Sequence, residues 1–247
     1  MNIDQLRMAA GKSLKGNWGL AIGSLMLTGI IYTGVHYLCL FIFSFSTVLR
    51  ILFTLLLVFP LYVGLFFLFL EIARGKKIDI GHLFIGYRHY FRIILTGILM
   101  ILLIGLWSLL FIVPGVIKCF SYSQTFYYLL DEPDLSPLQA IKKSTESMQG
   151  SIWLLCRLSL ITYGIWFLIP LIFYFGGLIA LSHQSGYLYA SSVDQQLFFM
   201  SLLILILGSI VQLVLYLLLF PRFLTALAHF HLETAQIPVR EPAPSTD

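Results

Sequence analysis

Five stretches of this sequence contain no Asp, Glu, Lys or Arg, and each is long enough to cross a lipid bilayer: residues 16–49, 51–70, 93–117, 158–193 and 195–221. A spanning helix needs about 20 mainly apolar residues. The runs are continuous and do not alternate between apolar and polar residues, which favours helices over the strands of a membrane barrel. Only 11% of the residues are charged, whereas a water-soluble domain carries roughly 25%. The sequence therefore predicts an all-α fold, a polytopic transmembrane helix bundle.

A further crossing, residues 115–131, is one that hydropathy alone would omit, because only residues 119–130 separate Lys118 from Asp131. Charge asymmetry favours it, since cytoplasmic loops of membrane proteins carry an excess of Lys and Arg. If these residues cross, Arg50 and Lys118 lie outside. The cytoplasmic side then receives Arg7, Lys12, Lys15, Arg74, Lys76, Lys77, Arg88, Arg92, Lys142, Lys143, Arg222 and Arg240.

The expected organisation is a single transmembrane domain over residues 1–233, followed by a disordered, Pro-containing cytoplasmic tail at 234–247. Its six spans are expected at about 18–44, 50–72, 92–113, 115–131, 152–176 and 197–221. The protein is expected to be a multi-pass protein of the cell membrane with both termini in the cytoplasm. The net charge of +4 gathers at the ends of the apolar runs, so nucleic acid is not an expected partner.

Residues 131–150, "DEPDLSPLQAIKKSTESMQG", form the most polar stretch of the chain. Ser136 suits a helix N-cap, Pro137 the first helical position, and Gln139 completes a capping box. Gly150 is expected to end the segment. The helix would lie at the inner membrane surface or against other spans, on an apolar stripe of Leu138, Ile141, Thr145 and Met148.

The N-terminus predicts a second amphipathic interfacial helix. Its apolar stripe comprises Ile3, Leu6, Ala10 and Leu14, at the spacing of one helical face. Lys12 and Lys15 lie beside this stripe and precede the first apolar run.

Two pairs of segments resemble each other and raise the possibility of a parallel internal repeat. "SLKGNW" (13–18) resembles "SMQGSIW" (147–153), and "VFPLYVGLFFLFLE" (58–71) resembles "LFPRFLTALAHFHLE" (219–233). Because both copies would start on the cytoplasmic side, their symmetry axis would run along the membrane normal. The correspondence weakens at the prolines, since Pro60 is expected within a span whereas Pro221 abuts Arg222.

The stretch "LLFIVPGVIKCFSYSQTFYYLLDEPDLSPLQAIKKSTESMQG" (109–150) resembles the signature of a bacterial integral-membrane family, the domain-of-unknown-function family 975. The resemblance implies a multi-span membrane protein of unassigned activity. A looser similarity connects the segment to the membrane domain attached to some glycerophosphodiester phosphodiesterases, but this chain has no matching catalytic domain. The matching positions are Pro114, Gly115, Tyr122, Asp131, Pro133, Ala140, Ile141, Ser144, Met148 and Gly150.

The candidate polar cluster consists of Asp131, Glu132, Asp134 and Arg157. The carboxylates could bind a divalent cation, but an acidic turn between helices is the favoured interpretation. Arg157 lies just inside an apolar run, where an unpaired charge is costly. We expect it to pair with Asp131 or Glu132 and thereby to hold residues 115–131 in place.

No residue pattern in the sequence predicts catalysis, a cofactor or a metal. His229 and His231 lie two positions apart and point to different sides of a helix, so each is expected to be a satisfied or interfacial histidine. Cys39, Cys119 and Cys156 are scattered in apolar sequence and predict small buried side chains rather than a disulfide or zinc framework.

Three classes of function remain open for such a chain. The favoured one is a non-enzymatic membrane protein that binds a lipid, peptide or protein partner, with membrane lipids, a membrane protein or a second copy of the chain as partners. The first alternative is a small transporter or export accessory, and the second is an enzyme that modifies membrane lipids.

Overall fold

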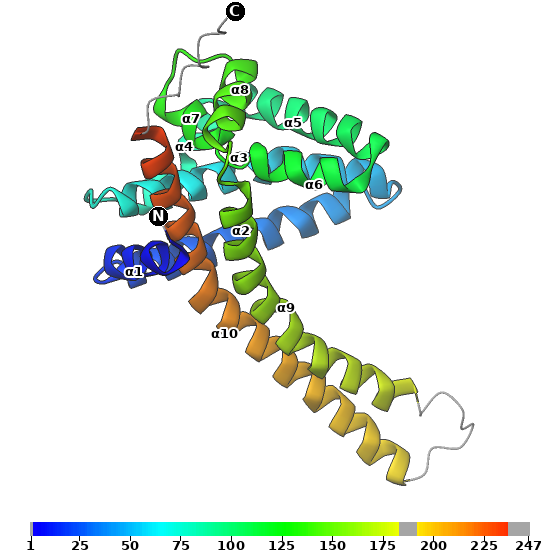
Figure 1. Ribbon diagram of the computed structural model, residues 1–247. Helices are drawn as coiled ribbons and strands as arrows, with labels where there is room; N and C mark the ends of the chain where they lie inside the picture. The colour runs from blue at the N-terminus through cyan, green and yellow to red at the C-terminus, as the bar shows by residue number, and fades with distance from the viewer. Residues whose placement is uncertain (1, 183–191, 237–247) are drawn as a thin grey trace, which may run out of the picture. The chain divides into compact units, whose positions relative to one another are not determined.

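The computed structural model describes residues 2–182 and 192–236, and all regular structure in these residues is helical. The chain forms two compact units (Figure 1). The first comprises Met1–Cys156 and Leu224–Asp247, and the second comprises Arg157–Phe223. The single domain predicted for residues 1–233 stays a prediction, and both unit boundaries fall inside helices, α9 and α10.

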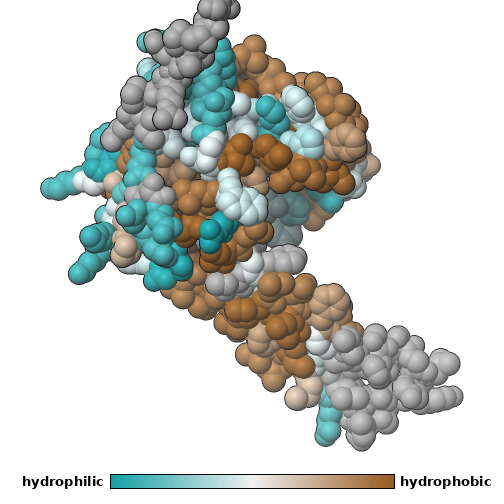
Figure 2. All heavy atoms as spheres, viewed as in Figure 1, coloured by the Kyte–Doolittle hydropathy of each residue, from teal (hydrophilic) through white to brown (hydrophobic). Residues whose placement is uncertain are grey.

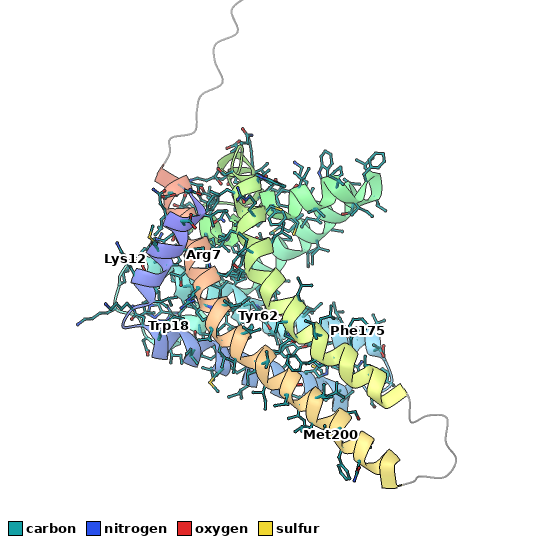
Figure 3. The ribbon with its side chains drawn as sticks, turned by 60° about the horizontal axis from the view of Figure 1, so that its bottom comes forward. Arg7, Lys12, Trp18, Tyr62, Phe175 and Met200 are labelled. Carbon is teal, nitrogen blue, oxygen red and sulfur yellow. The ribbon has the colours of Figure 1, made fainter. Side chains whose placement is uncertain are left out.

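Helix α1 (Ile3–Leu14) begins the first unit and confirms the predicted N-terminal amphipathic helix. Asn2 and Gln5 form a capping box at its start, which satisfies backbone N–H groups that the helix leaves unpaired. All four residues of the predicted stripe are buried, with at most 6% exposure. Arg7 and Lys12 are exposed and point to different sides of α1 (Figure 3).

Helices α2 (Trp18–Ile42) and α3 (Thr47–Ala73) form a hairpin, and their bounds lie close to those predicted for the first two spans. Pro60 lies inside α3. The short helices η1 (Ile80–Phe84) and α4 (Ile85–Arg88) pack directly on α3. A Cβ atom at Gly64 would lie 1.9 Å from the Leu83 carbonyl oxygen, so glycine is required for this close approach.

Helices α5 (Tyr90–Leu110) and α6 (Ile112–Ser121) form a second hairpin. The third span was predicted to run to 113 and to end at Pro114, but α5 ends at Leu110 and the chain reverses at Phe111. Pro114 instead lies in the first turn of α6, where a residue without an N–H loses no helical hydrogen bond. The hairpin packs closely because Gly115 lies against Ser108.

The predicted fourth span, 115–131, is not one helix: its residues belong to α6 and to α7 (Thr125–Asp131), which are separated at residues 122–124. The crossing predicted for 115–131 would therefore consist of two helices, and the crossing itself stays a prediction. The break is held by the next helix, α8 (Pro137–Ser147). The Ser144 hydroxyl donates to the Ser121 carbonyl (2.8 Å) and accepts from the Gln124 N–H (3.2 Å), which compensates for backbone bonds that the break removes.

Helix α8 confirms the predicted capping box of Ser136 and Gln139 with Pro137 in the first turn. Its predicted stripe is partly wrong, because Leu138 is 60% exposed. The buried positions are Ala140, Ile141, Ser144 and Met148. The face is rotated because α8 packs against both α5 and α7, a pair of neighbours that the hydrophobic pattern alone does not specify.

Helices α9 (Ile152–Ser182) and α10 (Ser192–Gln236) supply the second unit and part of the first. In the second unit they pack at Gly208, which lies against Phe173, while Phe175 and Met200 project outward (Figure 3). Both helices extend beyond the predicted spans 152–176 and 197–221, and α10 continues through Pro221. Residues 234–236 of the predicted tail belong to α10, and residues 237–247 lie outside the described residues.

Four described helices are long and apolar enough to cross a membrane: Trp18–Ile42, Thr47–Ala73, Tyr90–Leu110 and Phe198–Ala235. In the first unit, large apolar side chains are exposed along α2, α5 and α6, among them Phe41, Phe91, Leu109 and Ile112. Figure 2 shows brown apolar atoms over the α5–α6 hairpin and teal polar atoms gathered toward α1 and α8. Such surfaces are stable in lipid and costly in water.

Candidate functional site

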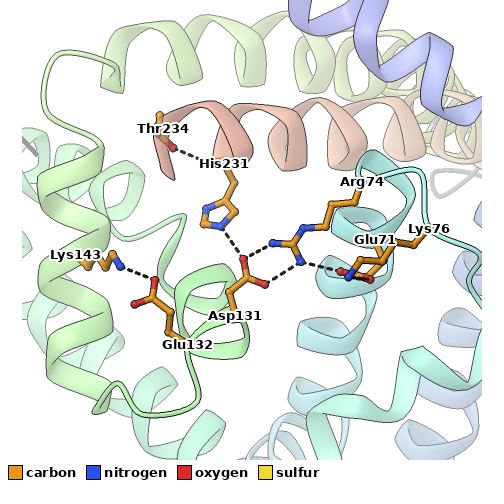
Figure 4. Close-up of polar contacts among 8 residues, drawn as sticks. All are labelled: Glu71, Arg74, Lys76, Asp131, Glu132, Lys143, His231 and Thr234. Carbon is orange, nitrogen blue, oxygen red and sulfur yellow. Dashed lines mark hydrogen bonds and ion pairs between the residues drawn. The ribbon is translucent and has the colours of Figure 1, made fainter. Parts of the chain in front are cut away.

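Several charged residues and one histidine of the first unit form a network where α3, α7 and the C-terminal part of α10 come together (Figure 4). Its members are Glu71, Arg74, Lys76, Asp131 and His231. The other four members lie far from Asp131 in the sequence, and no sequence pattern predicted that they would contact it. We define these five residues as the charge network.

Arg74 and Asp131 form the centre of the charge network. The guanidinium donates from Nη1 to Oδ1 (3.0 Å) and from Nη2 to Oδ2 (2.5 Å), so both carboxylate oxygens are held. Their side chains are only 25% and 20% exposed. Arg74 follows the last residue of α3, and Gly75 with φ +71° then turns the chain away. A cation at this helix C-terminus also interacts favourably with the helix dipole.

Glu71 extends the network on α3. Its side chain is 7% exposed and accepts from Arg74 Nη1 (2.7 Å), while Lys76 Nζ lies 2.7 Å from its other oxygen. Burial disfavours the charged form of Arg74, but hydrogen bonds to Asp131 and Glu71 outweigh it and raise the pKa of Arg74 above its ordinary value. Arg74 therefore stays a cation.

His231 brings α10 to the charge network. It is 1% exposed, its ring stacks on Tyr127 at 4.9 Å, and it meets the edge of Tyr128 at 4.7 Å. Its Nε2 atom lies 3.4 Å from Asp131 Oδ2. His229 instead contacts the Ser13 hydroxyl of α1 through Nε2 at 2.9 Å. Both histidines thus have partners on different elements, as their two-residue spacing predicts.

A second, more exposed set of contacts ties α7 to α8 and α5. Lys143 Nζ lies 2.5 Å from Glu132 Oε1. Arg92 Nη2 donates to the carbonyls of Glu132 (3.1 Å) and Leu135. Asp134 is exposed in the turn between α7 and α8.

Arg157 is exposed and belongs to the second unit, so its pairing with Asp131 or Glu132 stays a prediction. Within the first unit, Arg74 and His231 engage Asp131, and Lys143 engages Glu132. Arg74 reaches Asp131 because α3 and α7 pack side by side.

The positions of the family-like motif act within the fold of the first unit. Ser144 holds the break between α6 and α7, and Ala140 packs in a core with Val63, Ile93 and Leu129. Met148 is fully buried, and Gly150 has φ +80°, which disfavours any residue with a side chain. Pro133 lies exposed in the turn after α7, and Pro114 and Gly115 shape the start of α6.

The charge network joins side chains from three helices. Each oxygen of Asp131 and Glu71 is already held by a cation. Among residues 2–182 and 192–236, no group of three or more His, Cys, Asp or Glu side chains is placed to hold a metal ion. The network therefore defines a partly buried ionic clamp between α3 and α7, against which His231 of α10 packs.

Sequence reasoning missed Arg74 and His231 as members of the site. Two signals were present: Arg74 directly precedes a glycine after a long apolar run, and His231 is a polar residue within the last helical stretch. Neither signal names Asp131 as the partner, because that contact joins residues 57 and 100 positions apart.

The fold and site together define the class: a helical chain of the kind that resides in a membrane. Its described residues include four helices of spanning length and an ionic clamp at one end of the first unit. The chain matches no family model, no curated protein and no solved structure.

Proposed function

We propose that this chain is a non-enzymatic, multi-pass protein of the bacterial cell membrane that crosses the bilayer six times and binds anionic lipid headgroups at its cytoplasmic end. The observation that supports a non-enzymatic role is the charge network, whose carboxylates are fully occupied by Arg74, Lys76 and His231. The resemblance of residues 109–150 to the domain-of-unknown-function family 975 is part of this proposal.

The distribution of exposed cations within the first unit supports the orientation. The α2–α3 and α5–α6 turns lie on the same side of this unit, and α1, α4 and α7 lie toward the other (Figure 1). Exposed basic side chains come from α1, the turn after α3, α4 and α8: Arg7, Lys12, Lys15, Lys76, Lys77, Arg88 and Lys142. Each exposed cation near an anionic leaflet contributes about 1 kcal/mol to the attraction.

The fourth crossing, in this proposal, consists of α6 and α7 together. They return the chain from the α5–α6 turn to α8, and the break between them is bonded to Ser144 rather than left open to lipid. Non-helical backbone at membrane depth is tolerated only where protein covers it.

The parallel repeat is the finer part of the proposed architecture. In each half, a capped amphipathic helix (α1 or α8) is followed by a glycine with positive φ, Gly16 at +95° and Gly150 at +80°. Two long apolar helices follow, and the second contains an internal proline, Pro60 or Pro221. Pro60 and Pro221 thus both lie inside the second long helix of their half, although the residues next to them differ.

Lipid binding is tested by extracting the protein in native-lipid particles and identifying what accompanies it. We expect anionic phospholipid to be enriched over the bulk membrane, and the Lys12→Gln/Lys15→Gln/Lys142→Gln variant to lose that enrichment. A control that removes Lys118, a cation predicted to lie outside, should retain it. Equal lipid composition in all three samples would refute the lipid assignment, and a stoichiometric copurifying protein would identify a protein partner instead.

The topology is tested by single cysteines in a background without the native ones. Cysteines at Ser46 and at Lys77 should respond oppositely to a membrane-impermeant thiol reagent added to intact cells, with only Ser46→Cys labelled. Thr145→Cys should be protected like Lys77→Cys. Labelling of Thr145→Cys from outside would refute a fourth crossing by α6 and α7.

The runner-up function, a small transporter, is favoured by one observation: α6 and α7 form an interrupted helix. Interrupted helices form substrate sites in many transporter folds. Flux measured in proteoliposomes would separate this function from simple binding.

A further inference from the structure

The first unit contains a buried polar stripe that ends at the charge network. Gln124, directly before α7, and Tyr127, Tyr128 and Asp131 on α7 occupy positions i, i+3, i+4 and i+7, which lie on one face of a helix. Both tyrosine rings and the Asp131 carboxylate contact His231 of α10. Phe66 of α3 meets the Tyr127 ring edge-on at 6.2 Å. The stripe therefore lies between α3, α7 and α10.

Two residues of this stripe and His231 beside it have buried polar atoms without a hydrogen-bond partner in the described chain. They are Nε2 and Oε1 of Gln124, the Tyr127 hydroxyl and Nδ1 of His231. Gln124 is 0%, Tyr127 2% and His231 1% exposed. Burying such groups unpaired is unfavourable for each of them. Gln124 and Tyr127 lie on one face directly after the break between α6 and α7, and the His231 ring stacks on Tyr127, so this place differs from an isolated defect in packing.

The chemistry of the stripe specifies the kind of molecule that would satisfy it. The Gln124 amide and the Tyr127 hydroxyl can each donate and accept, and His231 Nδ1 donates or accepts according to its tautomer. The charges at the end of the stripe, Asp131 and Arg74, neutralise each other. A charged ligand would find no counter-ion among Gln124 and Tyr127, and its desolvation would oppose binding.

We propose that Gln124, Tyr127 and His231 form a binding site for small uncharged molecules that both donate and accept hydrogen bonds. Water is the smallest member of this class, and polyols and simple amides are the larger ones. The site lies at the start of α7, whose backbone is held in place by the bond from the Gln124 N–H to the Ser144 hydroxyl. This inference rests on the proposed six-crossing topology, because it places the site where an interrupted helix meets the interior of the protein.

The test uses variants that remove only the polar atoms, Tyr127→Phe and Gln124→Leu, in the full chain within native-lipid particles. Tyr87→Phe provides the benchmark, because the Tyr87 hydroxyl donates to the Leu57 carbonyl at 2.6 Å and so has a partner within the chain. Gln149→Leu, at an exposed position after α8, controls for the change of residue type.

If the stripe binds a ligand, Tyr127→Phe and Gln124→Leu should each lower the unfolding temperature by about 2–8 °C, and Tyr127→Phe should cost at least as much as Tyr87→Phe. If the atoms have no partner, removing them should leave the unfolding temperature unchanged or raise it. That second result for both variants would overturn the proposal.

The identity of the ligand follows from titration with glycerol and with acetamide. If the unfolding temperature rises more steeply with glycerol or acetamide concentration for the unmodified chain than for Gln124→Leu, the ligand is a polyol or an amide. If the two chains rise with equal slopes while the variants are destabilised, the ligand is water. Lipid enrichment is measured in the same particles. If anionic lipid is not enriched but Tyr127→Phe still lowers the unfolding temperature, the proposed function is refuted and this binding site is supported.

Discussion

Ser144→Ala is the substitution whose effect follows most directly from the structure. The Ser144 hydroxyl is fully buried and makes two bonds across the break, to the Ser121 carbonyl at 2.8 Å and from the Gln124 N–H at 3.2 Å. Alanine fits the same space on α8 but removes both bonds. One backbone acceptor and one backbone donor would then be buried without their partner.

Ser144→Ala is expected to lower the free energy of unfolding by about 2–4 kcal/mol. Each lost hydrogen bond contributes about 1 kcal/mol, and each backbone group left buried without a partner adds a desolvation penalty. For a chain of this size this corresponds to a fall in unfolding temperature of about 4–15 °C. The assay is thermal unfolding at a fixed scan rate, followed by tryptophan fluorescence. Hydrogen exchange supplies a local readout, because the Gln124 amide should lose protection.

Ser147→Ala is the matched control, one turn further along the same helix. The Ser147 hydroxyl donates to the Ser144 carbonyl (2.9 Å), which also accepts from the Met148 N–H (3.1 Å), so its loss strands no backbone group. Its expected effect is within about 0.5 kcal/mol. Equal unfolding temperatures for the two variants would show that Ser144 does not hold the break.

Three further predictions concern the ionic clamp and the glycines. Arg74→Met should destabilise by about 2–4 kcal/mol because it leaves a buried carboxylate short of its partner, and a double-mutant cycle with Asp131→Asn on unfolding temperature should show coupling of more than about 1 kcal/mol; strict additivity would refute the pair. Gly16→Ala, at φ +95° with open space around the added Cβ, should cost about 1–2 kcal/mol from backbone strain alone. Gly11→Ala, inside α1 and equally open, should instead stabilise by about 0.5–1 kcal/mol, so equal effects of the two would contradict the strain argument. Gly64→Ala should be the most damaging glycine substitution, since the new Cβ would lie 1.9 Å from a backbone oxygen of η1; limited proteolysis between residues 74 and 90 checks it, and unchanged cleavage would refute the close approach.

Structural features that depend on residues close together in the chain could be predicted from the sequence. The apolar runs predicted the bounds of α2 and α3 to within three residues, because a helix in an apolar run satisfies its own backbone. The capping box of Ser136 and Gln139 and the N-terminal stripe were also predicted correctly, since both depend on residues within a few turns of each other.

The tertiary structure specified what depends on contacts between distant residues. The break between α6 and α7 follows from a hydroxyl more than 20 positions further on, and no hydropathy pattern reveals it. The contact of Asp131 with Arg74 arises for the same reason: the charge of a buried carboxylate predicts that it has a partner, but only the packing of α3 beside α7 specifies Arg74. The rotation of the buried face of α8 is a third case, because two neighbouring helices, rather than its own hydrophobic pattern, define which side is covered.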